Sequence, residues 1–158
     1  MRRALLLLAS LGCSMSGQTV EARRWADHWA TVYGIQRELV YAVIEAESSW
    51  NSEATSSTGA AGLMQLMPDT AVAFRVKNRF DVAENIHAGV AYLALLRYQC
   101  GGDWRLAIAS YAAGYGRVQH RGLNYDSAEV VSYVSRVAYL YRRNRWETVL
   151  KLEKGGPA

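Results

Sequence analysis

Glu47 is the residue of this 158-residue chain that packing alone explains least well. Apolar spacing predicts a helix over residues 36–49, viewed at about 100° per residue. Three apolar residues share one side of this helix: Val40, Val43 and Ile44. Glu38 and Glu45 fall on the opposite side, which we expect to be solvated, whereas Glu47 falls in the middle of the apolar side. Because a buried carboxylate is costly unless it is paired or neutral, Glu47 is either bridged by an Arg, freed by a frayed helix end, or functional.

A functional Glu47 would be a general acid. Burial raises the pKa of a carboxyl, which then stays protonated near neutral pH and can donate to a leaving oxygen, as in lysozyme. The residues that follow suit a carbohydrate cleft. Residues 59–68 (GAAGLMQLMP) include two glycines that let backbone approach a ligand, an amide in Gln65 for sugar hydroxyls, and methionines for an apolar wall.

Helical periodicity dominates the elements that must position these residues. Proline occurs only twice, and no alternating run is long enough for a strand. Helices are predicted over residues 20–33, 36–49, 69–74, 82–99, 103–113 and 127–143, with loops over 50–62 and 115–126. Gly101 and Gly102 end the fourth helix, and Asp103 and Ser127 cap the next two. The sequence therefore predicts an all-α protein.

Composition excludes several classes of function. The length and a hydrophobic content of 51% suit one compact domain. The net charge of +4 is mild and dispersed, and no basic run with interleaved aromatics appears, so we expect no nucleic-acid partner. No Cys/His group has metal-ligand spacing, so we expect no structural metal.

The first residues are typical of export. Two arginines precede a short apolar stretch that ends in small polar residues, which predicts a signal peptide over 1–19. A catalytic domain over 20–146 and a flexible tail over 147–158 would follow. The stretch Ser10–Cys13 (SLGC) is close to a lipoprotein cleavage box, although Ser10 stands where an aliphatic residue is usual. Export to the periplasm or cell envelope is expected, with an outer-membrane anchor at Cys13 as the alternative to plain cleavage.

Five sequence blocks resemble those of the soluble lytic transglycosylases, whose catalytic domain is similar to goose-type lysozyme. The likeness runs from about Trp25 to Arg143. The blocks are residues 47–51 (ESSWN), 59–68 (GAAGLMQLMP), 80–86 (FDVAENI) with Gly89 and 91–93 (AYL), 110–114 (SYAAG), and Glu129 with Tyr133-Val134. Their order and spacing carry the resemblance, because a lone Glu-Ser pair would mean nothing.

The resemblance implies a single lysozyme-like helical domain with a substrate cleft. It implies that Glu47 is the sole acid/base in cleavage of the β-1,4 bond between N-acetylmuramic acid and N-acetylglucosamine, with 1,6-anhydromuramic ends. This chemistry needs no metal or organic cofactor. The resemblance also assigns six residues to the cleft: Ser56, Gln65, Met67, Tyr111, Glu129 and Tyr133. For Met67, Tyr111 and Tyr133, ordinary packing stays the alternative.

One departure from the family pattern is Ala112, where Asn is usual, which puts the rate or a sugar subsite in doubt. Two other hypotheses for the function stay open. One is a lysozyme-like hydrolase with Glu53 as a second carboxylate, and the other is a glycan-binding assembly protein, which Ala112 favours. We expect a monomer that acts on peptidoglycan glycan strands. Its small size suits service to a trans-envelope secretion, conjugation or phage apparatus.

Overall fold

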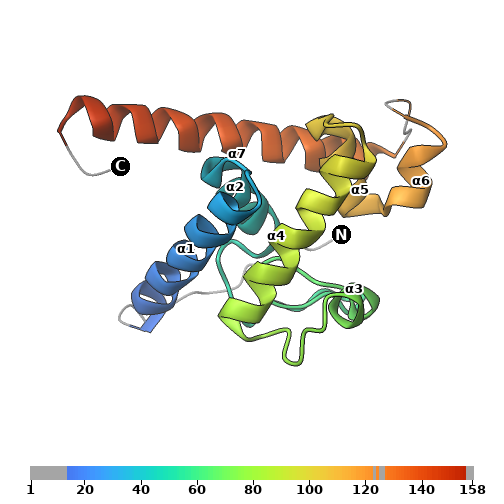
Figure 1. The fold of residues 1–158 in the computed structure, drawn as a ribbon, viewed down its shortest axis with the longest axis horizontal. Coiled ribbons are helices and arrows are strands. Elements are labelled where there is room, and N and C mark those ends of the chain that lie inside the picture. The colour runs from blue at the N-terminus through green and yellow to red at the C-terminus, as the bar shows by residue number, and fades with distance from the viewer. Residues whose placement is uncertain (1–13, 123, 125–126, 156–158) are drawn as a thin grey trace, which may run out of the picture.

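Seven α-helices make up the described part of the chain, residues 14–122, 124 and 127–155, in this computed structural model (Figure 1). They are α1 (Ser14–Val32), α2 (Arg37–Ser48), α3 (Pro68–Ala73), α4 (Val82–Gln99), α5 (Trp104–Ala113), α6 (Tyr115–Gln119) and α7 (Ala128–Glu153). Within these residues the only β pairing is two isolated bridges in the loop before α3. The predicted all-α class is confirmed.

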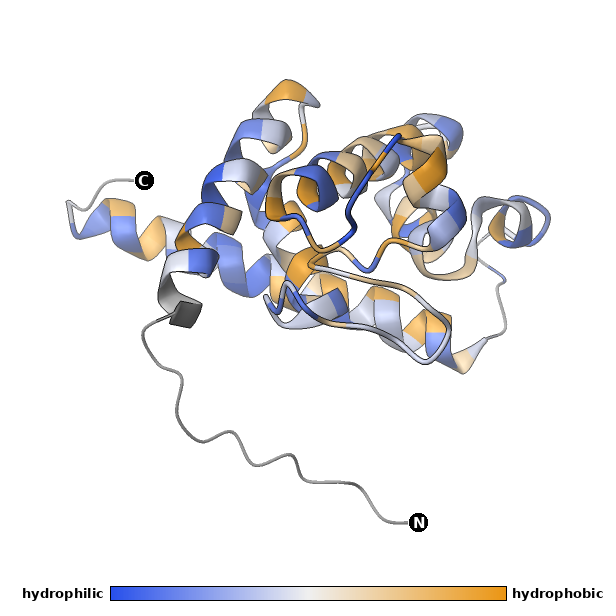
Figure 2. Ribbon diagram, turned by 90° about the horizontal axis from the view of Figure 1, so that it is seen from below, coloured by the Kyte–Doolittle hydropathy of each residue, from blue (hydrophilic) through white to orange (hydrophobic). Residues whose placement is uncertain are grey.

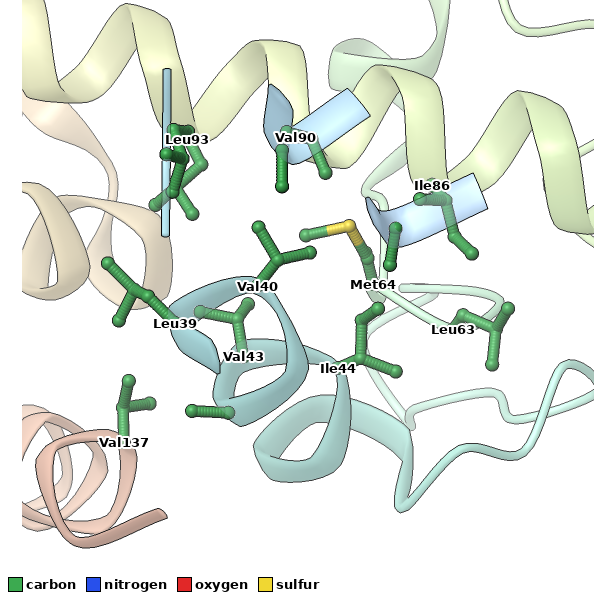
Figure 3. Close-up of a cluster of buried hydrophobic side chains, with 14 of the residues drawn as sticks. Leu39, Val40, Val43, Ile44, Leu63, Met64, Ile86, Val90, Leu93 and Val137 are labelled. Atoms are coloured by element: carbon green, nitrogen blue, oxygen red, sulfur yellow. The ribbon is translucent and has the colours of Figure 1, made fainter. Parts of the chain in front are cut away.

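Helix α2 supplies much of the core. It packs against α1 and α7, while α4 packs against α1 and α5. Figure 3 shows the apolar side of α2 facing α4 and the loop that carries Leu63 and Met64. The buried side chains are Leu39, Val40, Val43 and Ile44 from α2, Ile86, Val90 and Leu93 from α4, and Val137 from α7. Hydrophobic and hydrophilic residues alternate around the helices in Figure 2, as amphipathic periodicity requires.

Several boundaries differ from those expected. Helix α1 begins at Ser14, so the expected signal boundary at residue 19 falls inside it, and α6 occupies part of the expected loop over 115–126. Helix α7 continues to Glu153, through seven residues of the expected tail, and its end extends beyond the other helices (Figure 1). Asn144 and Thr148, both beyond the expected helix end at residue 143, donate hydrogen bonds to Glu38 of α2, contacts that local periodicity cannot reveal. Residues 1–13, with Cys13, lie outside the described residues.

The prediction that Glu38 and Glu45 lie on a solvated face is wrong. Both side chains are partly buried under α7, with exposed fractions of 16% and 25%. Glu45 forms an ion pair with Arg143, and Glu38 accepts hydrogen bonds from Arg37 and Thr148. Helix α2 lies between α1 and α7, so it has little free surface, and a helical wheel drawn for α2 alone contains no information about α7.

Asn85 of α4 holds the loop over residues 60–66 in place. It is buried; its Oδ1 accepts from the Met64 amide at 2.8 Å, and its Nδ2 donates to the carbonyls of Ala61 and Arg79 at 3.0 and 2.6 Å. Gly89, one turn further along α4, makes room for Met64, because a Cβ there would lie 2.3 Å from the Met64 sulfur. The loop is thus fixed to α4 by a polar anchor and a close apolar contact.

None of the described helices combines the length and the hydropathy needed to cross a bilayer.

Candidate active site

Glu47 lies in the last turn of α2, where the chain leaves the helix. Ser49 and Trp50 both take positive φ, at 52° and 67°, so the backbone reverses immediately after it. Burial raises the pKa of the Glu47 carboxyl to about 7; a hydrogen bond from Tyr133 and the charge of Arg136 act in the opposite direction but are smaller. The helix-end position and the raised pKa agree with what we expect of a functional Glu47, whereas a place at the floor of a cleft is not seen, because Glu47 lines none of the hollows described below.

Two tyrosines from distant parts of the chain lie close to this carboxyl. Tyr133, in α7, donates its hydroxyl hydrogen bond to Glu47 Oε1. Tyr111, in α5, donates to the carbonyl of Met64 at 2.8 Å. Burial raises the pKa of both phenols well above the ordinary value, and the charge of Glu47 is the next cause in each. Helices α2, α5 and α7 therefore converge on one partly buried acidic centre.

Tyr111 also lines a hollow of about 580 Å³, here called the Tyr111 hollow. Gln65 and Met67 lie on its wall, together with Thr58, Tyr92, Ala112 and Arg117. Met67 is 43% exposed, so it is a wall residue and does not fill the core. Gln65 differs from the expectation of a free amide: its Nε2 donates to the carbonyls of Ala54 and Gly62 at 3.0 and 2.8 Å. Its Oε1 is the atom left to meet a ligand.

Glu129 lines a neighbouring hollow of about 670 Å³, here called the Glu129 hollow. It is exposed in the first turn of α7. Three residues border both hollows, namely Ala112, Ala113 and Arg117. The two hollows therefore adjoin at the end of α5, and Ala112 lies where they meet.

Ser56 is separate from this group. Its Oγ accepts from the Ala60 amide at 3.0 Å and shares a hydrogen bond with Thr58 Oγ1 at 3.0 Å. Its backbone amide donates to the Ala60 carbonyl, so Ser56 closes the turn that leads into the 60–66 loop. It borders neither hollow.

The structure thus brings Glu47, Tyr133 and Tyr111 together, places Gln65 and Met67 on the Tyr111 hollow, and sets Glu129 in the adjoining one. Glu47 borders neither hollow, but its charge raises the pKa of Tyr111, which lines the first.

Sequence reasoning missed two residues at this centre. Tyr92 stands in the AYL block but was given no role; it lines the Tyr111 hollow, 5.4 Å from the Tyr111 ring, and burial raises its pKa. Arg136 lies one turn after Tyr133 and lowers the pKa of Glu47. No local signal identifies Arg136, because its nearness to Glu47 depends on how α7 crosses α2.

The described residues offer no other group with surroundings as suited to catalysis as those of Glu47. Glu53 is exposed, and its carboxylate accepts only a 3.4 Å hydrogen bond from Ser52. No three His, Cys, Asp or Glu side chains of the described part are placed to hold a metal ion. Glu47, whose pKa burial raises to about 7, is thus the best candidate for acid/base catalysis in the described part of the chain.

Comparison with known proteins extends this picture. The model of the transglycosylase SLT domain family matches residues 24–131. The chain is 45% identical over 93 residues to membrane-bound lytic murein transglycosylase F of Desulfosudis oleivorans, covering 55% of this chain and 20% of that protein. It is 42% identical over 94 residues to the transglycosylase of Enterobacteria phage PRD1, covering 54% and 34%.

The fold is similar to solved structures of the same kind. The 70 kDa soluble lytic transglycosylase of Escherichia coli superposes with a TM-score of 0.70 and 26% identity, covering 79% of this chain and 24% of that one. An inactive Glu-to-Gln variant of the lytic transglycosylase Slt of Pseudomonas aeruginosa gives 0.69 and 26%, covering 86% and 25%. The helical domain belongs to the transglycosylase SLT domain family. It spans a fifth to about a third of the curated relatives it matches.

Proposed function

We propose that this protein is a peptidoglycan lytic transglycosylase in which Glu47 serves first as acid and then as base. The observation that carries the proposal is the pKa of about 7 of a largely desolvated Glu47, close to Tyr111, which itself lines a hollow large enough for sugar rings. A pKa near neutrality lets one carboxyl be protonated at the start of a cycle and deprotonated within it. Family membership and the inactivity of the Glu-to-Gln variant of the Pseudomonas relative support a glutamate in this role.

In the first step, Glu47 donates its proton to the glycosidic oxygen between N-acetylmuramic acid and N-acetylglucosamine. The bond from the muramic C1 to that oxygen breaks, and the leaving sugar departs as an alcohol. The substrate's own 2-acetamido group stabilises the positive charge at C1, a substrate-assisted exception to the two-carboxylate scheme.

In the second step, Glu47 takes the proton of the muramic C6 hydroxyl. The C6 oxygen bonds to C1, which closes a 1,6-anhydro ring and returns Glu47 to its acid form. No water is added, so the scheme needs no second carboxylate to hold one. The exposure of Glu53, which has only a long hydrogen bond from Ser52, is consistent with this. The scheme also requires no metal or organic cofactor.

The remaining residues serve the substrate. Tyr133 orients the Glu47 carboxyl through its hydrogen bond, and Tyr111 holds the Met64 backbone while its ring borders the hollow. Met67 and Gln65 Oε1 are placed to meet sugar faces and hydroxyls, and Glu129 to meet a neighbouring sugar in the adjoining hollow. Ser56 shapes the loop beside them.

We further propose that the protein acts as an exported monomer at the cell envelope, on peptidoglycan glycan strands. Its similarity to a phage transglycosylase and to membrane-bound murein transglycosylases favours an envelope-crossing phage, secretion or conjugation apparatus as its setting. Signal cleavage near residue 19 and lipid attachment at Cys13 are distinguished by the mass of the mature N-terminus.

Mass spectrometry of the products from purified peptidoglycan tests the reaction type. Muropeptides ending in 1,6-anhydromuramic acid are expected. Reducing ends, which are 18 mass units (one water) heavier, would instead identify a hydrolase. Binding to sacculi with no released product would identify a glycan-binding protein, the reading that Ala112 favours.

Glu47→Gln tests the residue. It preserves shape but removes the transferable proton, so we expect glycan release to fall by at least about 10⁴-fold, the upper end for acid/base catalysis, while binding to sacculi is retained. Glu53→Gln is the matched control and should release product at the wild-type rate. The Glu45 carboxylate is a poorer control because it pairs with Arg143. Near wild-type release by Glu47→Gln would overturn the assignment.

A further inference from the structure

A third hollow, of about 310 Å³, lies between α1, α2 and α7, and it shares no residue with the Tyr111 or Glu129 hollow. We call it the basic hollow. Its charged lining residues are Arg23, Arg24, Arg37, Lys151 and Asp27, and its uncharged ones are Val20, Tyr41 and Thr148. The proposed cleavage of glycan uses none of them.

The basic hollow concentrates the charge of the protein. Four cations and one carboxylate give its lining a formal charge of +3, whereas the whole chain carries +4. Asp27, which also accepts a hydrogen bond from the Tyr41 hydroxyl, is one carboxylate among four cations and leaves the lining with a net positive charge. Gathering like charges in a concave site disfavours the empty state and attracts an anion.

The cations of the basic hollow have few partners within the protein and can therefore contact a ligand. The Arg23 guanidinium lies over the rings of Tyr41 and Trp50, 4.7 and 4.5 Å from their centroids, and it also interacts with the Tyr41 hydroxyl. A guanidinium has five N–H donors, so others remain for a ligand. Arg37 approaches Glu38 at 3.4 Å through Nε alone. Among the described residues, Arg24 and Lys151 make no ion pair or side-chain hydrogen bond.

We propose that the basic hollow binds a phosphate group. Guanidinium forks match the oxygens of phosphate in pairs, and the −1 to −2 charge of a phosphate fits a lining of +3 better than a single carboxylate does. The volume leaves space for the group and the start of an attached chain. Two sources share this chemistry, a free phosphate and the headgroup of an anionic lipid; Val20, 60% exposed on the lining, provides apolar surface for the second.

Binding of inorganic phosphate to the purified protein tests the group. We expect saturable binding by calorimetry and a rise in Tm that chloride at the same ionic strength does not reproduce. The double variant R24Q/K151Q should weaken phosphate binding at least fivefold. Its matched control, R142Q/K77Q, removes two exposed cations elsewhere and should bind as the wild type does.

Vesicles distinguish the sources. Co-sedimentation with phosphatidylglycerol–phosphatidylcholine vesicles, but not with phosphatidylcholine alone, that is lost in R24Q/K151Q and kept in R142Q/K77Q would identify a lipid headgroup. Phosphate binding without co-sedimentation would identify a free phosphate as the ligand. No saturable phosphate binding, or equal losses in the two double variants, would overturn the proposal. Glycan cleavage should be unchanged in both, which keeps this test separate from that of the proposed activity.

Discussion

The acidity of Glu47 is a balance of three effects. Burial raises its pKa most, while the Tyr133 hydroxyl and the Arg136 charge lower it, and the result is about 7. Burial alone would give a stronger base but one that seldom releases its proton near neutral pH. Full pairing with Arg would give a carboxylate that is seldom protonated. A residue that must act as acid and then as base needs the intermediate value.

Tyr133→Phe tests this balance. The change removes a hydrogen bond that favours the charged carboxylate, so the pKa of Glu47 should rise. The pH above which glycan release declines should therefore move upward from about 7, and the maximal rate should fall because the carboxyl is less well oriented. A pH–rate profile on purified peptidoglycan measures both effects.

The control for this profile is Tyr139→Phe, an exposed tyrosine of α7 that should leave it unchanged. A profile of Tyr133→Phe that moves to lower pH would contradict the role given to the hydroxyl.

At the scale of elements, the wall of the Tyr111 hollow depends on a loop without regular structure. Asn85 accounts for its stability, since one buried side chain satisfies three backbone groups of residues 61, 64 and 79. Gly62 belongs to the same arrangement: its φ is +80°, and a Cβ there would lie 2.2 Å from both the Arg79 carbonyl oxygen and the Asn85 amide nitrogen.

Asn85→Ala should therefore lower the free energy of unfolding by about 3–5 kcal/mol, because each backbone group left buried and unsatisfied costs about 1–3 kcal/mol. Urea unfolding followed by circular dichroism measures the change. Asn124→Ala, at an exposed position, should change stability by less than about 0.5 kcal/mol. A loss in Asn85→Ala no larger than in this control would show that the loop does not depend on Asn85.

At the scale of the whole molecule, the raised pKa of Glu47 makes stability depend on pH. The native state keeps this proton up to about pH 7, whereas the unfolded chain releases it near 4.5, so between these values the native state binds more protons. The free energy of unfolding therefore falls as pH rises through this window, by at most about 3 kcal/mol for a carboxyl that solvent partly reaches.

Glu47→Gln removes this dependence. Relative to the wild type, the variant should gain stability steadily from pH 4.5 to 7 and then hold that gain. Chemical unfolding at a series of pH values measures the difference. A difference that is constant across the window would mean that the carboxyl is not desolvated in the folded protein.

Much of the fold was predictable from residues close together in the chain. Val40, Val43 and Ile44 at helical spacing predicted α2 and its buried side, and the Asp103 and Ser127 caps predicted where α5 and α7 begin. The apolar surroundings of Glu47 followed from the same periodicity, since neighbours on one helical face are set by 3.6 residues per turn. The resemblance then indicated Tyr111 and Tyr133.

Only the tertiary structure decided the rest, because it depends on how helices cross. Arg136 lowers the pKa of Glu47, and Arg143 forms an ion pair with Glu45, although these residues are far apart in the sequence. The Gln65 side-chain amide donates to a carbonyl of an irregular loop. The length of α7 also depends on tertiary contacts, since Thr148 bonds to a residue of α2 that lies 110 positions earlier. Periodicity within one helix determines which side is buried; which groups meet that side is determined by the packing of the other helices.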